Sequence, residues 1–216
     1  MTTVQQVLNS ISAYVNQDPT LPSGTDLTSQ VNLIDQSQKE WADTYQWKKL
    51  QKTIAPSFGV SGTSIALPAY FKKLMSPLGD NETTPATTYI QIDPSERLYK
   101  SSTEKYVYQV GDDGTGYALV VNPPLPSAAT LTLDIQVAPT ALATLTDVVT
   151  CPSVQFLVLR TISKILSARS DPRFPQVKTD SDDVMASMIE EEMAHSGAEV
   201  NTTPNQFTRL GFRPGA

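Results

Sequence analysis

The chain has little of what catalytic and covalent chemistry usually needs. Its 216 residues include one cysteine, Cys151, and one histidine, His195. A single cysteine cannot form an internal disulfide, so a reducing compartment is the default expectation. One cysteine and one histidine are too few for a zinc site of the usual type, so we expect no metal. A nucleophilic pair of the two is formally possible, but the pattern favours a buried structural cysteine and an exposed histidine at a helix end.

Long apolar runs and an excess of positive charge are also missing. No stretch approaches about 18 consecutive apolar residues, so no membrane span is expected. The first residues, MTTVQQVLNSI, lack the basic region that starts a signal peptide. With 16 basic and 22 acidic residues, the formal net charge is −6, which argues against a general nucleic-acid-binding surface. Phosphate-loop and dinucleotide-binding glycine patterns do not occur, so we expect no cofactor.

Two helices are expected in the first part of the chain. Thr3 and Gln6 form a plausible capping box ahead of apolar residues at helical spacing, which predicts the first helix. The second is expected from about Leu27 to about Thr53. Its apolar residues fall on two stripes, one of which contains Trp47. We therefore expect it to pack against sister helices on one side and against something else on the other.

Two more helices are expected towards the end of the chain. CPSVQFLVLRTISKILSARSD, which starts at Cys151, has a proline suited to a first turn and a broad apolar face. TDSDDVMASMIEEEMAHSG, which starts at Thr179, is interpreted as the last helix, with an inner stripe rich in methionine. Asp180, Asp182 and Asp183 crowd its start, where the helix macrodipole favours carboxylates.

Between these helices the apolar period changes to that of strands. TLTLDIQV, residues 130–137, alternates strictly and predicts a half-buried strand with Gln136 on its outer face. YVYQV and YALVV flank GDDGTG, which is typical of a hairpin, and TTYIQI and TSIAL indicate further short strands. PAYFKKLM and DPSERLYKS are interpreted as short helical pieces.

The prediction is an α+β fold in three parts. About four helices from residues 1–56 and 140–197 form a bundle. A small antiparallel β-domain is inserted over residues 57–139. An extended C-terminal arm occupies residues 198–216.

The β-domain leaves an alternative function open. Glu96 and Glu104 could act as paired carboxylates in glycoside hydrolysis, although such a pair is not specific. Tyrosines could line a carbohydrate cleft, although alternate tyrosines more often fill or flank a β core. These tyrosines are Tyr89, Tyr99, Tyr106, Tyr108 and Tyr117. The runner-up hypothesis is therefore a carbohydrate-binding or hydrolytic β-domain on a helical stalk, and a chaperone used only during assembly is a third.

Three stretches of the chain match one family pattern in the same order. VNLIDQSQKEWADTYQWKKL, residues 31–50, is a polar helix with a spaced Trp–Tyr–Trp set. Two further stretches follow it along the chain. The first is IALPAYFKKLM, residues 65–75, and the second, after the strands, is VTCPSVQFLVLRTISKIL, residues 149–166. Together they resemble the second helix, the next segment and the return helix of bacteriophage head-to-tail adaptor proteins with an inserted β-domain. The similarity covers roughly residues 1–195 in the order of the elements.

This resemblance implies a structural role and no enzyme activity. Such adaptors form a ring, usually of twelve copies, below the portal of the capsid. The ring extends a channel through which double-stranded DNA passes without specific binding, and it offers a platform to tail or nozzle proteins. The implied location is the neck of the virion, after synthesis in the host bacterial cytoplasm. The size of the β-domain, about eighty residues, departs from the family pattern.

The resemblance and the composition together select candidate binding residues. NTTPNQFTRLGFRPGA, residues 201–216, has apolar anchors and arginines but no acid, which suits an arm that orders on binding the portal. The proposed portal-binding residues are Phe207, Arg209, Leu210, Phe212 and Arg213. Candidates for the subunit interface or the lumen are Trp47, Glu190, Glu191 and Glu192.

Overall fold

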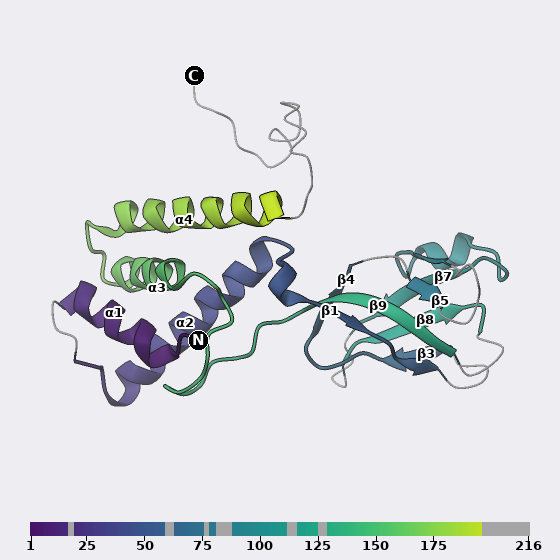
Figure 1. Ribbon diagram of the computed structural model, residues 1–216, viewed down its shortest axis with the longest axis horizontal. Helices are drawn as coiled ribbons and strands as arrows, with labels where there is room; N and C mark the ends of the chain where they lie inside the picture. Colours follow the sequence, from purple (N-terminus) through teal and green to yellow (C-terminus); the bar gives the residue numbers. More distant parts are fainter. Residues whose placement is uncertain are drawn as a thin grey trace, which may run out of the picture. The chain divides into compact units, whose positions relative to one another are not determined.

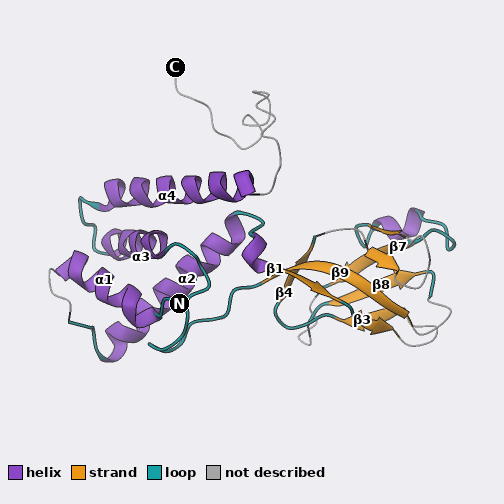
Figure 2. Ribbon diagram, in the orientation of Figure 1, coloured by secondary structure: helices purple, strands orange, loops and turns teal. Residues whose placement is uncertain are grey.

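A computed structural model describes residues 1–16, 20–58, 63–75, 78–80, 88–111, 116–124 and 129–195 (Figure 1). Contacts divide the chain into two compact units. The helical unit comprises Met1–Ser37 and Leu142–Ala216, and the β-unit comprises Gln38–Ala141. Figure 2 shows the strands gathered in the β-unit. The fold class is therefore α+β, as the sequence predicts.

In the helical unit, one α-helix lies between two others and packs against both. Helix α3 (Val154–Ala168) contacts both α1 (Val4–Asn16) and α4 (Phe174–His195). Its apolar face is buried because neighbours cover it on two sides; Phe156, for example, is 1% exposed. The helix expected from Cys151 is thus confirmed, with Ser153 rather than Pro152 at its start. The Ser153 side chain caps it by accepting a hydrogen bond from the Phe156 amide at 3.1 Å.

Helix α1 begins where the sequence predicts. The Thr3 amide donates to the Gln6 side-chain oxygen at 3.0 Å, which is the glutamine half of a capping box. Val4, Val7 and Leu8 are fully buried. The residues before α1 are held by a strand-like bridge in which the Val4 amide donates to Asp147 O at 2.9 Å.

Helix α2 (Gly24–Thr44) ends about nine residues earlier than the sequence predicts. A 3-10 turn, η1 (Lys48–Leu50), and strand β1 (Gln51–Ile54) replace its expected last turns. The apolar stripe that contains Trp47 is therefore not on a helix, and the prediction of a long helix with two apolar stripes is wrong. Residues of α2 up to Ser37 belong to the helical unit, and those from Gln38 belong to the β-unit.

The β-unit is built around one nine-stranded sheet. Its strands are β1, β2 (Ser57–Phe58), β3 (Ser64–Ala66), β4 (Phe71–Leu74), β5 (Leu78–Asp80), β6 (Thr88–Gln91), β7 (Tyr106–Val110), β8 (Ala118–Asn122) and β9 (Ala129–Val137). The order is β1-β9-β5-β6-β7-β8-β3, and β2 and β4 also pair with β9. All pairs are antiparallel except β6 with β7, which is parallel. The sheet is therefore mixed, and the long strand β9 organises one end of it.

The strand predicted at residues 130–137 is confirmed as β9, with one difference. Leu133 and Ile135 are fully buried, as the alternation requires. Gln136, expected on the outer face, is 3% exposed. Its amide donates to Ala42 O at 3.4 Å and to Tyr45 O at 3.2 Å, because the end of α2 covers that face of β9.

Of the two short helical pieces expected in the β-unit, one is confirmed and one is wrong. DPSERLYKS contains the 3-10 helix η2 (Glu96–Tyr99). PAYFKKLM instead contains strand β4, which pairs with β9. A β-bulge between Phe71 and Lys73 places both Phe71 and Leu74 on the buried face, and this three-residue spacing imitates a helix.

Helix α4 begins at Phe174, five residues before the expected start. Its first turn contains no acidic residue, so the predicted pairing of three aspartates with the start of the macrodipole is wrong. Asp180 accepts a hydrogen bond from Gln176 at 2.7 Å instead. Asp182 forms ion pairs with Arg160 at 3.0 Å and with Lys178 at 2.7 Å, which ties α4 to α3.

Candidate interaction surfaces

Trp47 is an internal residue of the β-unit. Its side chain is 2% exposed and stacks on Trp41, with ring centroids 5.2 Å apart. Its ring nitrogen donates to Trp41 O at 2.6 Å, at the end of α2. Tyr45 meets the same ring edge-on at 5.4 Å. A side chain enclosed in this way is not open to a neighbouring subunit, so only the three glutamates remain as interface or lumen candidates.

Two polar side chains from the sheet also bind the end of α2. Lys72 Nζ, from β4, donates to Ala42 O at 2.9 Å and forms an ion pair with Asp43. Gln136, from β9, donates to the same carbonyl. The last carbonyls of a helix have no partner within the helix, so these donors satisfy groups that would otherwise need water. Sequence reasoning missed this cap because its members are far apart along the chain.

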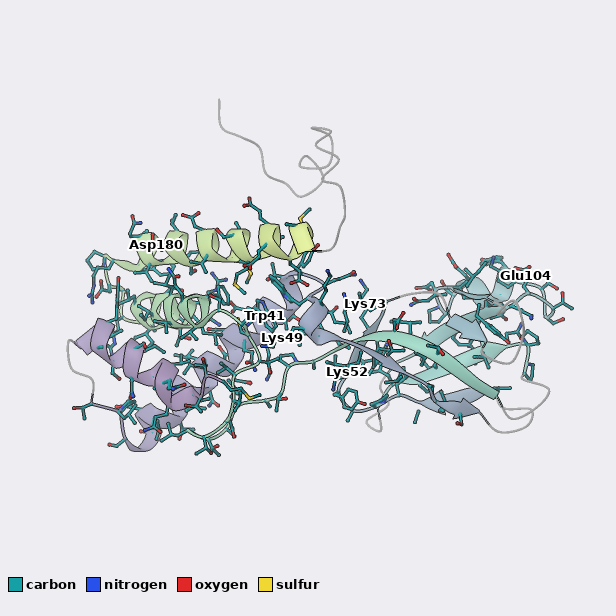
Figure 3. All side chains as sticks on the ribbon, viewed as in Figure 1. Trp41, Lys49, Lys52, Lys73, Glu104 and Asp180 are labelled. Atoms are coloured by element: carbon teal, nitrogen blue, oxygen red, sulfur yellow. The ribbon has the colours of Figure 1, made fainter. Side chains whose placement is uncertain are left out.

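Exposed lysines lie at the same end of the β-unit. Figure 3 labels Lys49, Lys52 and Lys73 there, and Glu104 at the opposite end. Lys52 Nζ lies 5.0 Å from the centre of the Tyr70 ring. Lys52 of β1 lies opposite Ile135 of β9, and Lys73 of β4 lies opposite Gln136 of β9. Adjacent register positions point to opposite faces, so these lysines surround the end of the sheet rather than form one flat patch.

The acidic residues of α4 give the helical unit a different surface. Glu190 and Glu191 are exposed and Glu192 is half-buried. The expected inner stripe is half-buried along Val184, Met185, Met188, Ile189 and Met193. Full burial on α4 occurs near its start, at Val177 and Ser181. The second half of α4 therefore presents apolar and acidic side chains that are both accessible.

The tyrosines of the β-unit do not gather on one surface. Tyr89 and Tyr106 are 3% and 8% exposed and belong to the core, whereas Tyr99 is 88% exposed. Tyr108 lies under the Arg97 guanidinium, 5.6 Å from ring centre to Cζ. The Ser101 amide, helped by Lys100, lowers the pKa of Glu104 below its usual value. A carboxylate held ionised in this way is a poor proton donor, so Glu104 would not be the general acid of a hydrolytic pair.

Cys151 is buried, as the sequence predicts, and its thiol donates to Ser153 O at 3.6 Å. His195 is the last residue of α4. Among the described residues, no group of three or more His, Cys, Asp or Glu side chains could hold a metal ion. No described helix is long and apolar enough to cross a membrane. The proposed portal-binding residues, from Phe207 to Arg213, lie outside the described part of the chain.

Each unit carries a cleft. In the β-unit, Gln91, Asp93 and Gln109 line a space of about 410 Å³ beside η2. In the helical unit, the start of α2 and the last turn of α3 enclose about 510 Å³. Asp26 and Gln30 of α2 and Ile165 of α3 are among the residues that line the second cleft. No sequence pattern indicated it, because its walls come from segments more than a hundred residues apart.

Comparison with protein families shows that the model of a family described as SU10 adaptor protein matches residues 2–191. The match therefore extends over parts of both units and over the four α-helices of the described residues, up to the last turn of α4. Comparison with curated proteins found none that matches.

Proposed function

Because this chain belongs to the SU10 adaptor protein family, we propose that it is a ring-forming head-to-tail adaptor that docks on the portal of a bacteriophage. Family membership establishes the coarser role: a structural, non-enzymatic phage adaptor and a component of the virion neck. The observation that carries the proposal is the extent of the match, which spans residues 2–191 without omitting the β-unit. The proposed ring has twelve copies, extends the DNA channel and provides the platform for tail or nozzle proteins.

The charges of the two units are compatible with a ring. A cyclic ring uses two different surfaces of each copy, one for each neighbour. The exposed lysines at one end of the β-unit offer a charged surface for one such contact, and we place the exposed glutamates of α4 on the lumen. The net charge of −6 suits a lumen along which DNA slides without sticking, since like charges repel.

We assign portal binding to the C-terminal arm. Its phenylalanines and leucine would enter apolar pockets, where aromatic anchors contribute most to binding. Its arginines would pair with carboxylates of the portal through charge-assisted hydrogen bonds. These residues lie 12 to 18 positions after His195, the last residue of α4.

Removing the arm tests this assignment. A chain without residues 201–216 should keep its helix content, because every described element ends before residue 196. It should no longer co-sediment with purified portal. The double variant Phe207→Ala/Phe212→Ala should weaken portal binding by at least about tenfold, since losing a buried aromatic anchor costs about 2 kcal/mol or more.

The matched control is Asn205→Ala/Gln206→Ala, which changes two polar residues of the same segment. It should bind portal as the unmodified chain does. Retained co-sedimentation of the truncated chain would show that the arm is not the portal-binding element. An image of the mature neck that lacks this protein would refute the adaptor role itself.

A further inference from the structure

The cleft in the helical unit is open to solvent, and five of its ten lining residues are apolar; we call these five its apolar floor. It lies where the loop before α2 and the first three turns of α2 face the last turn of α3. Its volume of about 510 Å³ is within the usual range for sites that bind small molecules or side chains. Its apolar lining includes Leu21, Pro22, Leu33, Ile165 and Ala168. Such a floor accepts an aromatic or aliphatic side chain.

The polar side chains of the lining are Ser23, Asp26, Ser29, Gln30 and Arg169, of which Asp26 alone is only an acceptor. The side-chain oxygen of Gln30 is buried and has no donor in the described part of the chain. Asp26 is exposed in the first turn of α2 and forms no ion pair among the described residues. The last turn of α3 adds the negative end of a helix dipole. These groups favour a ligand that brings N–H donors and positive charge.

One cation, Arg169, also lines the cleft. It lies close enough to Asp171 to contribute to the lowered pKa of that carboxyl, which falls to about 2, mainly through the hydrogen bonds from Arg173. Arg169 is therefore partly balanced by Asp171, outside the cleft. Asp26 is left as the carboxylate available to a ligand.

The chain itself contains a segment with the required chemistry. Residues 207–213, FTRLGFR, combine two phenylalanines and a leucine with two arginines and no acid. Its apolar residues match the floor of the cleft, and its arginines match Asp26 and the unsatisfied oxygen of Gln30. A planar guanidinium supplies five donors, enough to reach both acceptors after a side-chain rotation of Gln30.

The chain is long enough for this segment to return to the cleft. Helix α4 starts close to the cleft, six residues after Ala168, and its 22 residues extend about 33 Å. Residues 196–212 span about 56 Å when extended. Phe212 can therefore reach back along the full length of α4 with chain to spare.

We propose that this cleft binds the chain's own residues 207–213 before assembly, with a phenylalanine on the apolar floor and an arginine against Asp26 and Gln30. The arm is then stored on the helical unit until a stronger site competes for it. That the competing site is the portal rests on the proposed function; the docking in the cleft does not. Storage would keep the apolar anchors covered in the free protein and make binding of the arm to a partner depend on its release.

Limited digestion with trypsin of the full-length chain tests the docking without portal. Trypsin cleaves after Arg209 but not after Arg213, because Pro214 follows it. Release of residues 210–216, followed by mass spectrometry, therefore reports how often the arm is undocked. Ala168→Trp fills the cleft from an exposed position, so we expect release to become at least about ten times faster.

Ser167→Trp is the matched control, because Ser167 is the exposed neighbour of Ala168 and does not line the cleft. It should release the peptide at the unmodified rate. Asp26→Asn tests the charge without adding bulk and should also accelerate release, whereas Asp183→Asn should not. Circular dichroism checks that each variant is folded.

Three results would overturn the proposal. Equally fast release from the unmodified chain and from Ala168→Trp would mean that the cleft does not hold the arm. Equally slow release from both would assign the protection to another surface. Protection that increases with protein concentration would identify the occupant as the arm of a second copy. None of these outcomes bears on portal binding, which co-sedimentation measures separately.

Discussion

At the scale of single residues, Trp47 lies in a different environment from the one that the sequence predicts. The sequence places it on the second apolar stripe of a long helix, apart from Trp41 and Tyr45. In the structure the chain turns after Thr44, and Trp47 folds back to stack on Trp41. Its indole N–H donates to Trp41 O. It takes the place of the backbone amide that would donate there if the helix continued. The Trp–Tyr–Trp set stabilises the end of α2 rather than a surface.

Replacing Trp47 with phenylalanine removes that hydrogen bond together with part of the buried ring. Trp47→Phe keeps an aromatic ring but leaves the buried Trp41 carbonyl without its 2.6 Å donor. We expect the free energy of unfolding to fall by about 1–2 kcal/mol, as for other buried acceptors that lose a partner. The urea midpoint, followed by circular dichroism, measures it.

Tyr99→Phe is the control, since Tyr99 is 88% exposed and its change should be within about 0.5 kcal/mol. An unchanged midpoint for Trp47→Phe would mean that water satisfies the carbonyl equally well.

At the scale of elements, the sequence predicts the helices and strands that have a regular apolar period. It does not predict those whose period is interrupted. Helices α1 and α3 and strand β9 follow unbroken apolar periods, and the sequence identifies all three. The sequence of strand β4 predicts a helix, because its bulge makes Phe71 and Leu74 face the same way. The end of α2 was missed because its cap comes from Lys72 and Gln136, which become neighbours only when the sheet forms.

Helix α2 should depend on Lys72 for its last turn. Lys72→Met keeps most of the apolar stem but removes the donor to Ala42 O and the ion pair with Asp43. We expect a loss of about 1 kcal/mol and amide exchange in residues 40–46 that is about five times faster.

Lys73→Met is the matched control. Lys73 is the next residue and is exposed, so its substitution removes the same charge without touching the helix end. Equally accelerated amide exchange in Lys72→Met and Lys73→Met would show that the loss of positive charge matters and the loss of the cap does not.

At the scale of the whole molecule, the order of elements was predictable and the binding surfaces were not. Three weak motifs in the right order led to the family that the match over residues 2–191 establishes. The interaction surfaces depend on which residues remain exposed after folding, and one sequence does not give that. The cleft beside Asp26 is the clearest case, since its walls come from α2 and α3 and no local pattern marks them.

Charge should oppose assembly of the proposed ring. Each copy carries a formal net charge of −6, so neighbouring copies repel one another unless contacts pair their charges. Glu190 and Glu191 are exposed on α4, and we take them, with Glu192, to face the lumen. Salt screens this repulsion between copies, because the Debye length shortens to about 3 Å at 1 M.

The triple variant Glu190→Gln/Glu191→Gln/Glu192→Gln tests this placement. It removes three negative charges from each copy, so at low salt it should load onto portal more completely than the unmodified chain. At about 1 M salt, where repulsion is screened, the two should load equally. Mass photometry of portal complexes measures the number of bound copies. The triple change to aspartate keeps the charge and should behave as the unmodified chain. Poorer loading of the glutamine variant at low salt would instead place these glutamates in ion pairs with basic side chains of a neighbouring copy, at the interface and away from the lumen.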